Sequence, residues 1–159
     1  MHTIDTPDHT IILVSDHAGF PLKEELKTLL RDLNLKVRDL GPESAESVNW
    51  AEFGAMGARA VAEDPEHRRA ILICGSGIGM SIVANKFPGV RGALCHNPEA
   101  AAMSRRHNNA NVLCLGARVI SVDLAVDIVH TWLRTGFDGG RHQMRLDYLR
   151  DEVESRNFR

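Results

Sequence analysis

The sequence predicts an α/β fold, a three-layer Rossmann-like sandwich on a five-stranded parallel sheet. Short apolar runs alternate with amphipathic stretches as far as about residue 135, the pattern of a parallel sheet with helices on both faces. No repeat, low-complexity tract or linker interrupts that alternation, and 159 residues suit one domain. We therefore expect a single domain over residues 1–159, with 1–9 and 151–159 peripheral.

Each expected strand is a short apolar run ended by turn residues. The first, TIILV, is β-branched and is broken by Ser15-Asp16-His17-Ala18-Gly19. Gly41-Pro42 ends the second run, and a glycine-rich loop follows the third. The five expected strands are residues 10–14, 35–40, 69–74, 90–95 and 111–115.

The expected helices show apolar residues at helical intervals. In the first, leucines from Leu22 to Leu33 form one face and Lys23, Glu24 and Lys27 the other, with Pro21 suited to the first turn. Asn97 could cap the fourth helix. The expected helices are residues 20–33, 50–63, 80–86, 98–107, 119–134 and 141–155.

The charge balance bears on the class of partner. There are 19 Lys+Arg against 21 Asp+Glu, a formal net charge of −2, so no general basic field favours nucleic acid or a membrane surface. The first ten residues have no secretory pattern, and no apolar run approaches membrane-spanning length. We expect a cytoplasmic protein whose partner is a small molecule.

The three cysteines are Cys74, Cys95 and Cys114. Their odd number, wide spacing and lack of a C-x-x-C pair argue against disulfides and against a zinc cluster. Each sits at the end of an apolar run, so we expect all three near the carboxyl edge of the sheet, where ligands bind in such folds.

The strongest local signal is the segment Ile71-Leu72-Ile73-Cys74-Gly75-Ser76-Gly77-Ile78-Gly79-Met80-Ser81. A glycine loop before a helix can surround an anion with backbone N–H groups, although a tight packed turn would give the same pattern. The segment matches neither the P-loop nor the dinucleotide fingerprint. Cys74 could be a buried structural thiol, or a thiolate base favoured by the helix N-terminus. We interpret Cys95 and Cys114 as core residues.

The other candidate site residues are an aspartate, two histidines and three arginines. Asp16 and His17 follow the first strand, although Asp16 could simply cap a helix. His107 could be a helix-end cation or a general acid. Three further candidates are solvated surface residues or phosphate ligands: Arg118, Arg141 and Arg145.

Four segments taken together resemble one family. They are Ser-Asp-His-Ala-Gly-Phe, Ile-Cys-Gly-Ser-Gly-Ile-Gly-Met-Ser-Ile-Val-Ala-Asn-Lys, Ser-Arg-Arg-His-Asn-Asn-Ala-Asn-Val-Leu and Gly-Gly-Arg-His-Gln-Met-Arg. In this order they are similar to the ribose-5-phosphate isomerase B family, which also includes galactose-6-phosphate and allose-6-phosphate isomerases. The resemblance covers about residues 11 to 150.

The resemblance implies an isomerase without cofactor or metal that interconverts ribose 5-phosphate and ribulose 5-phosphate in the non-oxidative pentose phosphate pathway. It also implies a homodimer or dimer of dimers with sites at the subunit interface. By position, Cys74 matches the base, and His107 matches the proton donor for ring opening. The matched enediolate loop is Gly75, Ser76, Gly77, Ile78 and Gly79, and the other matched substrate contacts are Asp16, His17, Asn108, Arg118, Arg141 and Arg145.

One segment departs from the family's pattern. Where many members have Asp-Tyr-Pro, this chain has Asn49-Trp50-Ala51, so a carboxylate and a phenol are missing. The alternatives are therefore an isomerase of a hexose phosphate, such as galactose 6-phosphate or allose 6-phosphate, and a noncatalytic phosphosugar sensor. A cysteine hydrolase is a weaker alternative, because the sequence shows no pocket for an acyl substrate.

Overall fold

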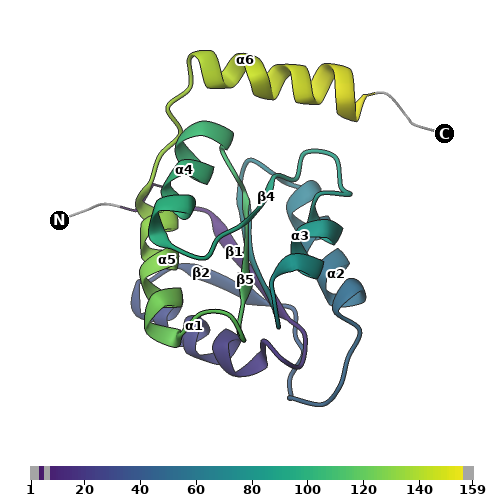
Figure 1. Ribbon diagram of the computed structural model, residues 1–159, viewed down its shortest axis with the longest axis vertical. Coiled ribbons are helices and arrows are strands. Elements are labelled where there is room, and N and C mark those ends of the chain that lie inside the picture. The colour runs from purple at the N-terminus through teal and green to yellow at the C-terminus, as the bar shows by residue number, and fades with distance from the viewer. Residues whose placement is uncertain (1–3, 6–7, 156–159) are drawn as a thin grey trace.

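A computed structural model describes residues 4–5 and 8–155. It contains one parallel sheet with strand order β2-β1-β3-β5-β4 (Figure 1). The expected fold class is confirmed. The strands are β1 (Thr10–Ser15), β2 (Lys36–Asp39), β3 (Arg68–Cys74), β4 (Gly92–Leu94) and β5 (Val112–Gly116).

The strand register fixes which residues reach the carboxyl edge. β3 pairs with β5 from Ala70 opposite Val112 to Cys74 opposite Gly116, so Cys74 ends its strand as expected. Cys114, however, pairs with Leu72 in the middle of β5 and is fully buried. The expectation that all three cysteines lie at the edge is therefore wrong for Cys114, because β5 continues to Gly116.

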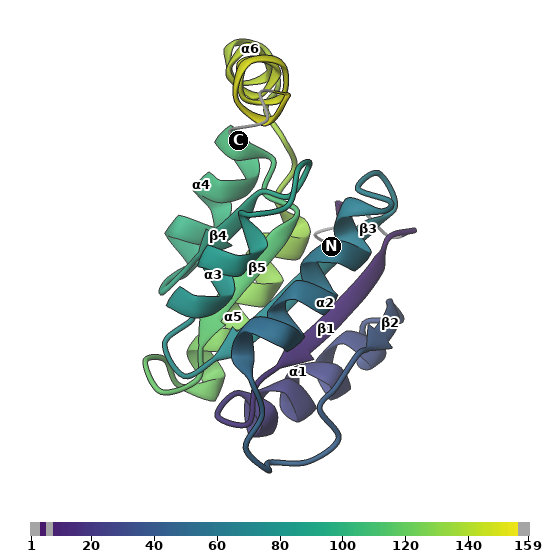
Figure 2. The ribbon, with the colours of Figure 1, turned by 90° about the vertical axis from the view of Figure 1, so that its right-hand side faces the viewer.

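Helices cover both faces of the sheet (Figure 2). α1 (Phe20–Asp32), α4 (Pro98–Asn108) and α5 (Val122–Arg134) bury leucine, alanine and Trp132 side chains in one core cluster. α2 (Trp50–Ala62) and α3 (Ile78–Ala84) contribute small side chains and Met80 to a second cluster on the other face. The strands lie between these layers, as in a three-layer sandwich.

Two helix starts differ from the expectation. α3 begins at Ile78 rather than Met80, because Gly77 adopts a left-handed conformation as the N-cap, and it ends at Ala84. α5 begins at Val122 rather than residue 119, because the Ser121 side chain accepts a hydrogen bond from the Leu124 amide. No helix in the described part of the chain has the length and apolar character that crossing a bilayer requires.

The C-terminal helical arm lies at one end of the molecule. It consists of α6 (Arg141–Tyr148), continued by a π-helical turn, η1 (Leu149–Glu154). Figure 1 shows the arm across the end of the molecule beyond α4. His142 is its one buried residue, while Met144, Tyr148 and Val153 are exposed. A helix with so little of its apolar surface covered leaves a surface for another molecule.

The chain before β1 also contacts the body of the protein. Ile4 packs against the first core cluster, and Asp5 pairs with Arg69 and Arg105. Of the segments expected to be peripheral, residues 1–3, 6–7 and 156–159 lie outside the described residues, while residues 151–154 belong to η1.

Candidate active site

A pocket of about 550 Å³ opens at the carboxyl edge of the sheet. It lies beyond β1 and β3, where the strand order reverses, which is the usual ligand site of such sheets. Seven of the expected site residues line it: Asp16, Cys74, Gly75, Ser76, Ile78, Gly79 and Arg118. The expected Gly77 belongs to the same loop without lining the pocket.

The Cys74 thiol is held by its own loop. The Gly77 amide donates a hydrogen bond to Cys74 Sγ at 3.1 Å, and the Ile78 amide donates to Ser76 Oγ at 3.2 Å. This hydrogen bond fixes the sulfur at the end of β3, where Cys74 lines the pocket. Two amides expected to cradle substrate oxygens are therefore engaged with side chains of the loop itself.

Two glycines make this loop possible. Gly77 has a φ of +78°, and a Cβ there would lie 2.5 Å from Leu94 Cδ1. A Cβ on Gly116 would lie 2.5 Å from the Ser76 carbonyl oxygen. The loop thus packs directly on the end of β5, where any side chain would push it away.

Asp16 combines a structural role with a place in the pocket. It is buried, and its Oδ1 accepts a hydrogen bond from the Gly19 amide at 2.9 Å, so it fixes the turn before α1. His17 does not line the pocket, and its Nδ1 accepts a hydrogen bond from the Val48 amide at 3.2 Å. A neutral His17 therefore carries its proton on Nε2.

Arg118 lies against the glycine loop. Its amide donates to the Gly75 carbonyl at 2.9 Å, and its Cδ, Cζ and Nη1 lie within 4 Å of the position that a Cβ on Gly75 would take. It is exposed and makes no ion pair with another described residue. A free guanidinium at the mouth of a pocket is suited to an anionic ligand.

The other two cysteines have no such surroundings. Burial raises the pKa of Cys95 to about 11, and burial also raises the pKa of Cys114 far above its usual range. Both thiols therefore remain protonated near neutral pH, as expected of core residues.

The remaining four expected residues lie at the other end of the sheet. α4 runs back from the carboxyl ends of the strands, so its last residues, His107 and Asn108, reach the amino edge. Arg91, directly before β4, confirms this position by donating from Nε to the Asn108 carbonyl at 3.1 Å. Arg141 and Arg145 lie on α6 at the same end. The seven residues of β3 alone span roughly 20 Å, so a single chain keeps these residues apart from Cys74.

The amino-edge residues are organised around two stacked imidazoles. The rings of His107 and His142 lie 4.4 Å apart at 13°. Burial, followed by the positive charges of His107, Arg141 and Arg145, lowers the pKa of His142. Donor atoms of His107, Asp138 and His142 lie within 4.8 Å of one another, close enough to hold a metal ion.

Three pocket residues fell outside the expected substrate contacts. Trp50, Ile82 and Val119 line the pocket at the carboxyl edge, and the indole of Trp50 packs over Gly79, where a Cβ would lie 2.8 Å from the ring. Ile82 follows Ile78 by one helical turn, a spacing that could have identified it. The sequence marks Trp50 only as a departure from the family's Asp-Tyr-Pro segment.

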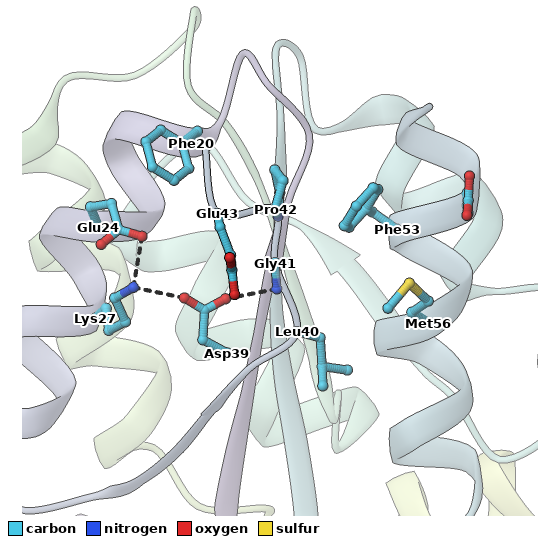
Figure 3. Close-up of a pocket in the computed structure, with 11 residues that line it drawn as sticks. Phe20, Glu24, Lys27, Asp39, Leu40, Gly41, Pro42, Glu43, Phe53 and Met56 are labelled. Carbon is cyan, nitrogen blue, oxygen red and sulfur yellow. Dashed lines mark hydrogen bonds and ion pairs between the residues drawn. The ribbon is translucent and has the colours of Figure 1, made fainter. Parts of the chain in front are cut away.

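A larger cleft of about 810 Å³ lies between α1, β2 and α2. Figure 3 shows Lys27 between Glu24 and Asp39, with 2.7 Å to each carboxylate. Asp39 also accepts hydrogen bonds from the buried Lys23 at 2.7 and 2.8 Å and from the Gly41 amide. The two lysines satisfy the carboxylates of Glu24 and Asp39, and no expected site residue lines this cleft.

Comparisons with known proteins show what the chain is similar to. A family profile described as Ribose/Galactose Isomerase matches residues 11–149. Ribose-5-phosphate isomerase B of Escherichia coli strain K12 is 42% identical over 142 residues, covering 89% of this chain and 95% of the relative. A protein of Pectobacterium atrosepticum named D-erythrulose-4-phosphate isomerase is 40% identical over 141 residues, covering 88% and 92%.

The fold is also similar to those of solved structures. The crystal structure of ribose-5-phosphate isomerase B from Mycoplasma genitalium with bound ribulose-5-phosphate has a TM-score of 0.90 and 36% identity, covering 93% of this chain and 98% of that one. The Clostridium thermocellum ribose-5-phosphate isomerase B structure has a TM-score of 0.85 and 48% identity, covering 89% and 95%.

Proposed function

Because this chain belongs to the ribose/galactose isomerase family, we propose that it is an aldose–ketose isomerase that interconverts D-ribose 5-phosphate and D-ribulose 5-phosphate. The observation that carries this proposal is the position of Cys74, which lines the carboxyl-edge pocket with its sulfur hydrogen-bonded to the Gly77 amide. This reaction needs one base beside two adjacent carbons of a phosphosugar.

The chemistry follows from the loop. The thiolate of Cys74 removes the proton from C2 of the open-chain aldose, and the electron pair forms the enediolate. The hydroxyl proton moves from O2 to O1, and returning the carbon-bound proton to C1 gives the ketose. The amides of Gly77 and Ile78 are engaged with side chains, so the other N–H groups of the loop and of the first turn of α3, which lack intrahelical acceptors, stabilise the developing oxyanion. Such donors are worth roughly 3 kcal/mol each.

Ring opening and phosphate binding need the second group of residues. We propose that His107 protonates the ring oxygen, that Asn108 contacts the sugar, and that Arg141 and Arg145 bind phosphate, with Asp16, His17 and Arg118 completing the contacts. The chain keeps His107 and Cys74 at opposite ends of the strands, a separation longer than a pentose phosphate. A second copy therefore supplies His107 to the site that holds Cys74, and the working unit is a homodimer.

Exposed apolar side chains at both ends support the dimer. Ile78, Ile82 and Val119 surround the Cys74 pocket, and Met144, Tyr148 and Val153 follow the C-terminal helical arm. Apolar surface at both ends fits contact with a second copy. The three cysteines form no disulfide, which fits a reducing cytoplasm.

A second candidate substrate differs in the length of the sugar. Trp50 forms a wall of the pocket, and one relative is named for a four-carbon sugar phosphate. Hexose phosphates are the other option. Ranking tetrose, pentose and hexose phosphates by kcat/KM, in the wild type and in Trp50→Tyr, separates these candidates.

The direct test is turnover of ribose 5-phosphate to ribulose 5-phosphate by the purified chain. We expect turnover without added metal, lost in Cys74→Ala. Thermal stabilisation by phosphosugars with no turnover of any of them would instead support a noncatalytic sensor.

A further inference from the structure

We propose that the amino edge of the sheet holds a second anion-binding pocket, built from Arg69, Arg91 and His9, that takes a phosphate group of a small metabolite. A pocket of about 400 Å³ lies there, lined by these three residues and also by Glu66, Asn109 and Asn111. Arg69 is the second residue of β3 and Cys74 the last. The pocket is therefore at the opposite end of that strand from the thiol, and the proposal does not depend on the isomerase activity.

The first observation is an incompletely paired guanidinium. Arg69 is 5% exposed. Its Nη2 donates to Asp5 Oδ2 at 3.1 Å, while its buried Nη1 has no hydrogen-bond partner among the described residues. A buried donor left unpaired costs free energy that an anion can recover.

The second observation is an excess of positive charge. Arg69 and Arg105 share a single carboxylate, Asp5, at 3.1 and 3.4 Å. Burial, followed by the charge of Arg69, lowers the pKa of Arg105 to about 10, as expected where guanidinium groups crowd together. Buried charges are normally paired one to one, but here one carboxylate serves two guanidinium groups.

The third observation is the orientation of Arg91. Its Nε donates to the carbonyls of Asn108 and Asn109 at 3.1 and 3.0 Å, and its Nη1 to the Gly89 carbonyl. These bonds fix the guanidinium at the pocket, and Arg91 has no carboxylate within ion-pair distance among the described residues.

A phosphate monoester fits these groups best. Two guanidinium groups, Arg69 on β3 and Arg91 directly before β4, match the double charge of a phosphate better than the single charge of a carboxylate. The volume leaves space for a short organic group beyond the phosphate itself. Glu66 is exposed at the rim and opposes anion entry, so it offers a way to strengthen binding without disturbing the core.

NMR of the full ¹⁵N-labelled chain, titrated with inorganic phosphate at constant ionic strength, tests the pocket. We expect saturable shifts of the Gly89 and Arg91 amides, separate from any shifts of Gly75 and Gly77 at the Cys74 pocket. Arg91→Met should weaken the Kd read at Gly89 by about tenfold or more, because it removes charge-assisted hydrogen bonds, while shifts at Gly75 persist.

A second variant guards against misfolding of Arg91→Met. Glu66→Gln should tighten the Kd read at Gly89 by about two- to threefold, whereas Glu25→Gln, an exposed change of equal charge on α1, should leave it unchanged. Absence of saturable shifts at Gly89, or an equal effect of the two glutamine variants, overturns the proposal. Shifts confined to Gly75 and Gly77 also overturn it, and they would leave the proposed enzyme activity intact.

Discussion

The two edges of the sheet position functional groups in different ways. At the carboxyl edge, backbone hydrogen bonds lock the loop that carries Cys74, with the Ala117 amide 2.8 Å from the Cys74 carbonyl and the Arg118 amide 2.9 Å from that of Gly75. At the amino edge, His107 ends a helix and stacks on His142 of the C-terminal helical arm, whose outer side is uncovered. The sheet preorganises one half of the proposed site, while the other half depends on an exposed arm.

The largest effect on activity should come from removing the Cys74 thiol at the carboxyl edge. We expect Cys74→Ala to lower kcat/KM by about a thousandfold, because it removes the proposed base, with the thermal unfolding midpoint nearly unchanged. Steady-state kinetics and circular dichroism measure both. Cys95→Ala is the matched control and should retain activity. Equal losses in the two variants would show that the locked loop has no special catalytic role.

The next effect is on the free energy of unfolding and concerns an ion pair beside the carboxyl edge. Asp39 pairs with Lys23, whose side chain is fully buried, and Asp39→Asn should lower the free energy of unfolding by about 3 kcal/mol at neutral pH. Burial raises the pKa of Asp39, but hydrogen bonds from Lys23 and Lys27 outweigh it and hold the pKa below its usual range.

The sign of the pH dependence follows from that shift. Because the folded pKa lies below the unfolded one, the stabilisation is full above about pH 4 and is lost as the pH falls through the folded pKa. Urea unfolding at several pH values should show a steeper acid loss for the wild type than for Asp39→Asn. Asp32→Asn, an exposed change on α1, should keep the wild-type slope. Parallel pH profiles for wild type and Asp39→Asn would contradict the assignment.

A smaller effect should appear at the exposed arm. Met144 is 73% exposed in the single chain, and a second copy that covers it would gain about 1.5 kcal/mol or more from its burial. Met144→Ser should therefore raise the dimer dissociation constant by about tenfold, measured by sedimentation equilibrium. Met56→Ser, on α2 away from the arm, should not change it. An unchanged constant for both would show that the arm does not contact the partner.

The last test asks whether one active site takes Cys74 and His107 from different chains. Co-refolding Cys74→Ala with His107→Ala should restore about a quarter of wild-type activity, since half of randomly paired dimers are mixed and each has one intact site of two. Each variant refolded alone is the control and should stay inactive. No recovery in dimers shown to be mixed would place both residues in one chain's site.

Sequence patterns predicted the fold and the loop that carries Cys74 well, because both depend on local signals. Apolar runs ended by glycine gave the strands, and the glycines after Cys74 marked a close approach that only glycine tolerates. Cys114 was misplaced, because an apolar run does not show where β5 ends. The alternation of strands and helices already implied that α4 returns to the amino edge, but no local motif shows that His107 and Cys74 lie apart. Trp50 became a pocket residue only through packing over Gly79.

The distance between Cys74 and His107 has a consequence for gene dosage. If the site is shared by two chains, an isolated chain has no catalytic activity, so the number of active sites depends on the concentration of dimers. While the chain is scarcer than its dimer dissociation constant, doubling its synthesis yields about four times as many centres, and above that level about twice as many. Metabolic flux through such an enzyme would therefore rise steeply with expression at low abundance and in proportion to it once chains are plentiful.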